Sequence, residues 1–237
     1  MEKVLFEELY KQHISYLIGE ITETDPIFEG NFSRLDFADL CLDGRNISNA
    51  DFHNSVFKNV DMRCCIFHSC NFSGTRFINC RMTCSEFNGS NFKFAKFDNC
   101  RATACSFDST TIYRTLALSS VFDRSVFINS IFTGGGFKQC LLNDVNMDKT
   151  VFVDTPVFFD KCMIRDISMK HITGVENVDM IDCFDEENDH IDIKFVIKNN
   201  KLDFVKYFLS NIERAVKMLV PSNNGKRLQI QDSNTKN

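Results

Sequence analysis

The sequence predicts a repeat protein whose chain turns a corner every five residues, and three observations predict it. A bulky apolar residue, or in a few places alanine, returns at every fifth position from Phe52 to Phe152. A small or β-branched residue lies two positions before each of these centres, from Ala50 to Thr150. A period of five matches neither the 3.6-residue turn of an α-helix nor the two-residue alternation of a strand. It suits a chain that bends after each unit.

Before the repeat, residues 2–21 carry apolar residues mainly along one stripe, with Glu and Lys elsewhere. The stripe consists of Leu5, Leu9, Ile14, Leu17, Ile18 and Ile21. This pattern predicts an amphipathic helix, and Pro26 ends it. We expect residues 1–29 to form a helical cap over the open end of the repeat.

The repeat begins near Gly30, where the frame is ambiguous. Phe32, Phe37 and Leu42 are in phase with the later centres, but Leu35 and Leu40 offer a competing frame. Arg45 occupies a small-residue position, so residues 43–45 are predicted to form a bulge or loop. Regular behaviour is expected from Ile47 onward.

At the other end the pair Phe158-Phe159 shifts the frame by two residues. The old frame would bury Asp160, Arg165 and Lys170, whereas the shifted frame buries apolar residues such as Cys162 and Ile164. Because burying an unpaired charge is far more costly, we predict the shifted frame. The pattern fades at 172–174, so residues 30–174 are predicted to form the repeat domain.

The units Ala50-Asp51-Phe52, Cys70-Asn71-Phe72 and Ser90-Asn91-Phe92 show a bulky centre, a small residue two before it, and Asp or Asn between. This pattern resembles the pentapeptide-repeat proteins, over about 25 consecutive units and more than half of the chain. The resemblance implies an all-β solenoid, namely a right-handed quadrilateral β-helix with four units in each coil. About six coils are expected, with the centres inside and the terminal helices capping the ends.

The C-terminal region is predicted in three parts. Residues 175–190 form an acidic linker, residues 191–220 a helical segment stopped by Pro221, and residues 221–237 a polar, disordered tail. The helical segment offers an apolar face for capping or dimerisation, formed by Phe204, Val205, Phe208, Leu209 and Ile212.

Charge and cysteine usage narrow the partners and the compartment. Residues 30–160 contain 13 acids and 13 bases, so the rod is neutral overall and carries no basic nucleic-acid footprint. Six of the 11 Cys occupy the small-residue column, where they read as small apolar fillers. No signal peptide or membrane-length apolar run is visible, so a reduced, cytoplasmic protein without membrane contact is expected.

The outward position between the small residue and the centre changes character along the rod. It is mostly polar up to Thr111 and mostly apolar from residue 116 to residue 151. The apolar members are Leu116, Val121, Val126, Ile131, Leu141 and Val151. We expect these residues to make two adjacent faces of the C-terminal coils apolar. Either the protein's own C-terminal helix covers them, or they bind a partner or a second copy of the chain.

Residues suited to catalysis are not grouped. The five His are scattered and pair with no Cys or carboxylate at catalytic spacing; they are His13, His53, His68, His171 and His190. The outward Cys64 and Cys84 are expected to stack one coil apart, but no His completes a four-ligand zinc set. We therefore predict no enzymatic activity, no cofactor and no metal.

The functional prediction is a non-catalytic bacterial scaffold that binds another protein, of the kind that includes members translocated into host cells. A homodimer through the C-terminal coils or helix is compatible with it. The alternative implied by the resemblance is a DNA mimic that binds DNA gyrase and protects it from quinolone- or albicidin-type inhibitors. Mimicry needs a surplus of outward carboxylates, and the neutral rod does not favour it.

Overall fold

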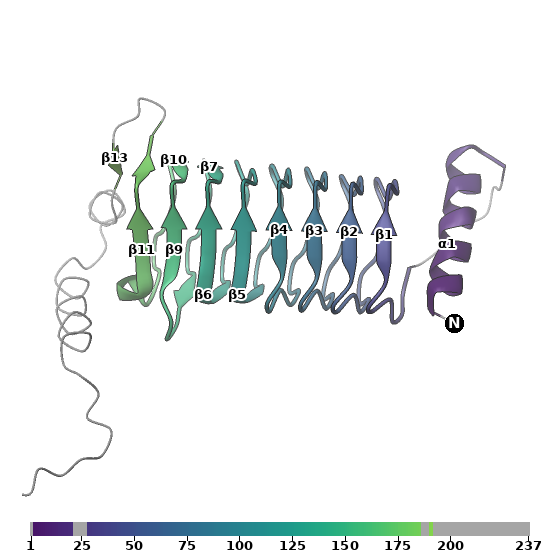
Figure 1. The fold of residues 1–237 in the computed structure, drawn as a ribbon, viewed down its shortest axis with the longest axis horizontal. Helices are drawn as coiled ribbons and strands as arrows, with labels where there is room; N and C mark the ends of the chain where they lie inside the picture. The colour runs from purple at the N-terminus through teal and green to yellow at the C-terminus, as the bar shows by residue number, and fades with distance from the viewer. Residues whose placement is uncertain (1, 21–27, 186–189, 192–237) are drawn as a thin grey trace, which may run out of the picture.

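The protein forms a straight rod of stacked coils with a helix at its N-terminal end (Figure 1). The structure is a computed structural model and describes residues 2–20, 28–185 and 190–191. Residues 204, 205, 208, 209 and 212, the predicted C-terminal contact face, lie outside this description, as do the helical segment beyond residue 191 and the tail.

Residues four units apart lie side by side on neighbouring coils, as the resemblance implies. Asn31 pairs with Asp51, Cys41 with Asp61 and Asn46 with Ile66, all in parallel. Each coil therefore has four sides of one unit each, which we name after the outward residue of the first coil: the Asn31, Asp36, Cys41 and Asn46 sides. Sides two units apart in sequence, such as Asn31 and Cys41, lie opposite each other.

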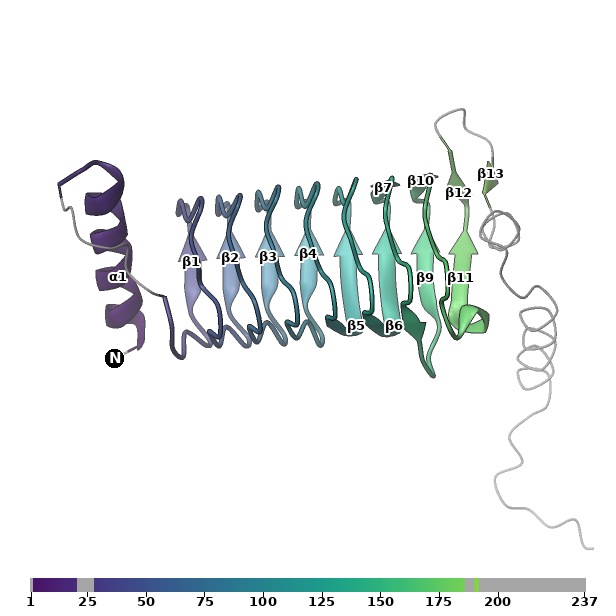
Figure 2. The same cartoon turned by 180° about the vertical axis from the view of Figure 1, so that it is seen from behind.

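The Asp36 side carries the longest ladder of strands, which lie next to one another along the rod (Figures 1 and 2). Its eight strands run in the order β1-β2-β3-β4-β5-β6-β9-β11, and β8 also pairs with β6. Eight strands define seven steps along the rod, against about six coils predicted. The strands are β1 Asp36–Ala38, β2 Val56–Lys58, β3 Arg76–Ile78, β4 Lys96–Asp98, β5 Thr111–Leu118, β6 Ile131–Lys138, β8 Val151–Phe152, β9 Val157–Asp160 and β11 Val178–Ile181.

A second sheet forms on the Cys41 side of the C-terminal coils. Its order is β13-β12-β10-β7, with β7 at Leu141–Asn143, β10 at Met163–Arg165, β12 at Cys183–Phe184 and β13 at His190–Ile191. β13 pairs antiparallel with β12, whereas the other pairs are parallel. An antiparallel last strand covers the exposed edge of β12, which would otherwise be open to another chain.

The core is a set of aromatic ladders. Phe52, Phe72 and Phe92 stack with centroid distances of 5.3 and 5.2 Å, and their rings are nearly parallel. Rings from different ladders meet edge-on, as Phe72 and Phe87 do at 5.9 Å. Both geometries are favourable for aromatic pairs, so a Phe-rich centre fills the coil with well-oriented contacts.

The corners are made by the residue two places after each centre, which adopts the left-handed conformation. Asn54, Asn79 and Asn99 have φ of 58°, 54° and 52°. Asn tolerates this region better than most residues because its short polar side chain bonds locally. The five-residue period is therefore a succession of short extended segments separated by left-handed corners.

The small residues two positions before the centres do more than fill space. Ser55 Oγ donates to the Phe32 carbonyl at 2.8 Å and accepts from the Leu35 amide at 3.1 Å. Cys65 Sγ likewise lies 2.8 Å from the Leu42 carbonyl. The interpretation of these cysteines as apolar fillers was therefore incomplete, because each thiol donates to the backbone of the preceding coil.

The N-terminal helix α1, Glu2–Leu17, lies across the first coil (Figure 2). Phe6 contacts the rings of Phe28, Phe32 and Phe37, with centroid distances of 4.5–5.6 Å. The Cys41 amide donates to Tyr10 Oη at 3.2 Å. The helix covers the end of the rod as predicted, but through a different stripe, since the predicted Leu5 and Ile18 are 46% and 64% exposed.

The frame at the start of the repeat follows Phe32, Phe37 and Leu42, which are all buried, while Leu35 and Leu40 are half-buried. The predicted bulge at 43–45 does not change the register, since the pairings before and after it both join residues four units apart. Arg45 is 6% exposed in a small-residue position.

Near the C-terminus the two-residue shift is confirmed. Gly136 pairs with Phe158 and Phe137 with Phe159, so each partner lies two positions beyond the usual four units, and Cys162 and Ile164 are buried. The prediction that the repeat ends at 174 was wrong, because the chain adds a 3-10 turn, η1 (Val175–Asn177), and then β11 and β12. Val178 and Cys183 of the predicted linker are fully buried, while Asp182 is exposed, so Asp182 lies on the outer surface of a further coil.

Across the described ranges, no helix has both the length and the apolar character required to cross a lipid bilayer.

Candidate interaction surface

The six apolar residues predicted as an interaction surface are spread around the rod. Leu116 lies on the Asp36 side, Val121 and Leu141 on the Cys41 side, and Val126 on the Asn46 side. Ile131 and Val151 pair on the Asn31 side. The prediction of two adjacent apolar faces was wrong, because the two stacked pairs lie two units apart and therefore on opposite sides.

Exposure separates these six residues further. Ile131 is 46% exposed, whereas the other five are half-buried. On the Cys41 side Leu141 is followed by Met163 and Phe184 in the same column, both half-buried. An apolar strip along this side is thus the only part of the predicted surface, among the coils the structure describes, that continues over four coils.

The chemistry of the thiols argues against a nucleophilic cysteine inside the rod. Burial raises the pKa of Cys65, Cys70 and Cys105 to about 12, so these thiols are protonated at neutral pH. Cys64 and Cys84 are exposed at the corners of successive coils, as predicted. No group of three His, Cys, Asp or Glu side chains in the described ranges is arranged to hold a metal ion.

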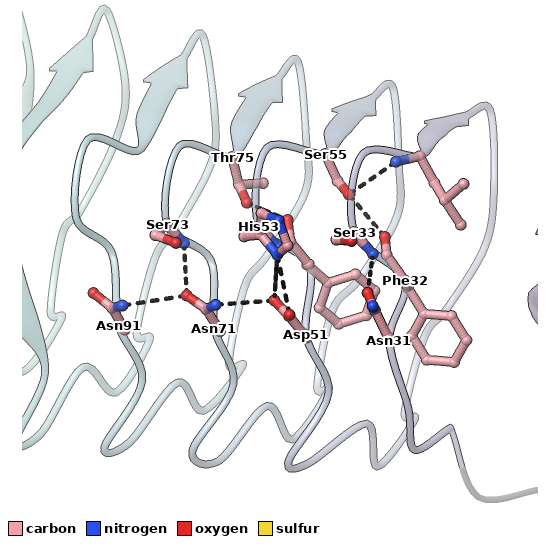
Figure 3. Close-up of polar contacts among 12 residues, drawn as sticks. Asn31, Phe32, Ser33, Asp51, His53, Ser55, Asn71, Ser73, Thr75 and Asn91 are labelled. Carbon is pink, nitrogen blue, oxygen red and sulfur yellow. Dashed lines mark hydrogen bonds and ion pairs between the residues drawn. The ribbon is translucent and has the colours of Figure 1, made fainter. Parts of the chain in front are cut away.

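The Asn31 side begins with a polar ladder (Figure 3). Asn91 Nδ2 donates to Asn71 Oδ1 at 3.2 Å, and Asn71 Nδ2 donates to Asp51 Oδ1 at 2.9 Å. Each side chain also accepts the amide of the residue two positions on, as Asn71 does from Ser73 at 3.2 Å. These side chains are occupied within the ladder, so this part of the side is architectural.

Where this ladder ends, an exposed aromatic cluster begins. We define the aromatic corner as Phe94, Tyr113 and Arg114. The rings of Phe94 and Tyr113 meet edge-on with centroids 5.2 Å apart, and the Arg114 guanidinium carbon lies 5.4 Å from the Tyr113 ring centroid. Phe94 is 52% exposed, Tyr113 is half-buried and Arg114 is exposed.

Phe94 occupies a corner position with φ of 59°, the left-handed region. Among the described corner residues it is the only phenylalanine, and Asn, Asp, Ser and Gly are frequent there. For a bulky side chain this conformation costs roughly 1–2 kcal/mol. Its exposed ring recovers little of that cost by burial, so the needs of the fold do not account for Phe94.

The aromatic corner was not among the predicted site residues, although the sequence contains a signal for it. Phe94 breaks the corner column two places after each centre, where Asn54 and Gly74 stand in the two preceding coils on this side. A large hydrophobic residue in a column of turn formers is the pattern that would have identified it.

A model of the family described as pentapeptide repeats matches residues 31–74, 46–83 and 70–108, with eight copies. No curated protein matches the chain significantly.

Several solved structures are similar to the chain. A trypsin-treated form of QnrB1, described as a plasmid-mediated fluoroquinolone resistance protein, is 17% identical, with a TM-score of 0.46, over 76% of this chain and 97% of that one. HetL from the cyanobacterium Nostoc sp. strain PCC 7120, described as involved in heterocyst differentiation regulation, is 9% identical, with a TM-score of 0.23. That match covers 75% of this chain and 97% of HetL.

Proposed function

Since this chain is a pentapeptide-repeat protein, we propose that it is a non-catalytic scaffold that binds another protein through the aromatic corner. The observation that carries the proposal is the exposure of Phe94 in a strained corner, edge-on to Tyr113. A cytoplasmic location and delivery into a host cell stay expectations from the sequence and the resemblance.

The composition of the aromatic corner supports a protein contact. Tyr and Arg are among the residues enriched at the centres of protein interfaces, where a few side chains carry most of the binding energy. The contacts that Tyr113 makes with Phe94 and Arg114 restrict the rotamers of all three side chains before any partner arrives. A preorganised cluster loses less conformational entropy on binding.

The test uses Phe94→Asn, because Asn fills the equivalent corner at Asn54, Asn79 and Asn99. A photo-crosslinking phenylalanine analogue at position 94 first captures the partner in cells, and mass spectrometry identifies it. We expect Phe94→Asn and Tyr113→Ala each to weaken binding of that partner at least about tenfold. The thermal melt of Phe94→Asn should stay at or above that of the wild type, since Asn relieves the strained corner.

The control for this experiment is Asn54→Ser, which alters the corner two coils earlier in the same column and retains a residue common at such corners. It should leave binding unchanged. If Phe94→Asn binds the captured partner as tightly as the wild type, the aromatic corner is not the contact and the proposal fails.

The apolar residues of the C-terminal coils are proposed as a second contact, for a homodimer or for the same partner. The half-buried strip on the Cys41 side supports this, because Val121, Leu141, Met163 and Phe184 follow one another along it. Val121→Lys combined with Leu141→Lys should leave the circular dichroism spectrum unchanged. It should either lower the molar mass measured by light scattering or weaken binding of the captured partner. If neither quantity changes, this strip is not an interface.

Protection of gyrase by DNA mimicry has little support in the charge distribution. Acids on neighbouring coils seldom coincide in the described outward columns, and Asp144 beside Asp166 is an isolated case. A DNA-like surface needs a continuous row of negative charges. We expect the protein at micromolar concentration to give no protection in a gyrase supercoiling assay with a fluoroquinolone, and protection there would restore this alternative.

A further inference from the structure

Charge is segregated around the rod even though the repeat is neutral overall. Over residues 51–110, the Asp36 and Cys41 sides carry six bases and two acids, whereas the other two sides carry one base and three acids. We name the six bases the basic stripe: Lys58, Arg63, Arg76, Arg81, Lys96 and Arg101. The net charge of these two sides is +4, beside −2 on the other two.

Within the basic stripe, like charges lie directly on top of one another. Arg76 pairs in register with Lys96, and Arg81 with Arg101. Directly opposed like charges destabilise neighbouring strands. Asp61 offsets part of this repulsion, because its carboxylate lies 2.7 Å from the Arg63 guanidinium and 2.9 Å from that of Arg81. No residue in the described part of the chain forms an ion pair with Arg76, Lys96 or Arg101, and all three are exposed.

A groove runs along the corner between these two sides. It has a volume of about 340 Å³, and Arg81 and Arg101 line it together with Asn79 and Asn99. Asn99 Nδ2 donates to Asn79 Oδ1 at 2.9 Å, so the amides form a fixed row beside the guanidinium groups. Guanidinium groups bind carboxylates through two parallel hydrogen bonds, whereas the Asn79 and Asn99 amides bond to one another along their own ladder and only line the groove.

The basic stripe also reaches the aromatic corner. Lys96 and Arg76 lie on the Asp36 side, between the groove and Phe94, which is only two residues from Lys96. From one edge of the Asp36 side to the other, the surface therefore presents exposed rings, two unpaired cations, and then the groove. A ligand that carries one apolar side chain followed by several carboxylates would match this order.

We infer that this surface binds a short acidic segment of the partner protein, with an apolar side chain at the aromatic corner and carboxylates over Arg76, Lys96 and Arg101. The inference rests on the proposed function and names the chemistry of its partner. A segment that crosses the Asp36 side would meet the aromatic corner, the two cations and the groove in turn.

The extent of the surface favours a peptide over a nucleic acid. Asp36, Asp39 and Asp43 of the first coil bound the basic stripe at one end, and apolar Leu116 and Val121 bound it at the other. The stripe therefore covers three coils, or ~10 Å from first to third. Single-stranded nucleic acids use longer basic tracks with a ring for each of several successive bases, and this surface has two rings at one point.

The test measures binding of a fluorescein-labelled ten-residue glutamate peptide with one central phenylalanine, by anisotropy. Lys96→Glu combined with Arg101→Glu should weaken binding at least tenfold. The matched control is Lys149→Glu combined with Lys170→Glu, which makes the same change in net charge on the Asn46 side, where both residues are exposed. The control should change binding less than twofold, and thermal melts establish that both variants fold.

Equal losses in the two double variants would overturn the inference, because binding would then follow overall charge. Tighter binding of a labelled 20-nucleotide single strand than of the peptide would overturn it in favour of a nucleic acid. If the wild type does not bind the peptide but the Phe94→Asn variant no longer binds the captured partner, the inference fails and the proposed scaffold function stands. If Phe94→Asn keeps the partner, the scaffold proposal fails by its own test.

Discussion

At the scale of single residues, the position two before each centre explains why Ser, Thr and Cys interchange in this chain. Ser90 Oγ donates to the Phe67 carbonyl at 2.7 Å and accepts from the Cys70 amide at 2.9 Å. Cys105 Sγ makes the corresponding donation to the Met82 carbonyl at 2.9 Å. The sequence predicts the volume required at this position. It does not predict the hydrogen bond, because the partner is the backbone of the preceding coil, far away along the chain.

Ser90→Ala tests this role. The substitution leaves the Phe67 carbonyl and the Cys70 amide without this partner in a buried site, so we expect the free energy of unfolding to fall by about 1–3 kcal/mol. Urea unfolding followed by circular dichroism measures the change.

Ser90→Cys is the control, because a thiol occupies the same position at Cys70 and Cys105 and donates in the same way. It should be closer to the wild type than Ser90→Ala is. Equal losses in the two variants would mean that volume, and not the hydrogen bond, sets the residue at this position.

At the scale of elements, helix α1 shows where periodicity was insufficient. The helix and its capping position were predicted, but the stripe withdrawn from solvent consists of the buried Phe6 and His13 with the half-buried Leu9 and Tyr10, and of these only Leu9 was predicted. Aliphatic residues dominated the predicted stripe, whereas the open end of the first coil presents the rings of Phe28, Phe32 and Phe37. Aromatic complementarity therefore decides the docking face, and the sequence of the helix alone does not contain that information.

His13 makes the docking of α1 depend on pH. Its side chain is fully buried, and burial together with nearby Arg45 lowers the pKa of His13 from 6.5 to about 4. The docked helix therefore favours the neutral imidazole. The contribution of His13 to the free energy of unfolding is fully present above pH 6.5. As the pH falls toward 4 the unfolded chain takes up a proton that the folded chain excludes, so stability falls by up to roughly 3 kcal/mol.

His13→Leu isolates this contribution. Urea unfolding of the two proteins at pH 7, 5.5 and 4 should show a wild type that loses more stability than the variant over this range. Parallel pH profiles would show that other groups cause the dependence.

Strand β6 shows an element that the sequence did predict. The frame shift followed from the cost of burying charges, and the structure accommodates the two extra residues between the Phe132–Phe152 and Gly136–Phe158 pairs, opposite residues 133–135. A Cβ at Gly135 would collide with the Thr115 carbonyl oxygen, and one at Gly136 would collide with that of Phe158. Gly135 and Gly136 are thus required by close backbone approach, which the requirement for small residues anticipated only in part, whereas a Cβ at Gly134 would meet only side-chain atoms of Thr155 and Arg114.

At the scale of the whole molecule, the coil was predictable because each unit repeats the same local choice of centre, small residue and corner. The arrangement of the outward residues was harder to predict, since it depends on which sides are opposite. The six apolar candidates were assigned to adjacent faces, although residues two units apart lie across the rod. The last coil was missed because its outward acids resembled a linker, and because its spacing to the coil before is one residue longer than four units.

Phe92→Asp tests whether the rod behaves as one cooperative unit. Phe92 is 1% exposed and stacks on Phe72, so the variant would place a charge in a dry aromatic ladder. We expect loss of the β signal throughout the rod, measured by circular dichroism, together with insolubility or a molten chain.

Phe92→Leu serves as the control, because Leu142 occupies a centre in a later coil and is fully buried. It should fold with a moderate loss of stability. A soluble Phe92→Asp protein with a cooperative melt would contradict the inward assignment of the centres.

Up to Phe152 neighbouring coils keep a constant register of four units, so a change in the length of the chain can act on the surface in two different ways. Inserting or deleting four whole units in phase would move the aromatic corner along the axis by one coil, ~4.8 Å, and keep it on the same side. Inserting a single unit between Arg81 and Phe94 would carry every later side chain a quarter turn around the axis and separate the aromatic corner from Arg76. Length can therefore change in whole coils without cost to a binding surface, while smaller changes alter which partner the rod can face.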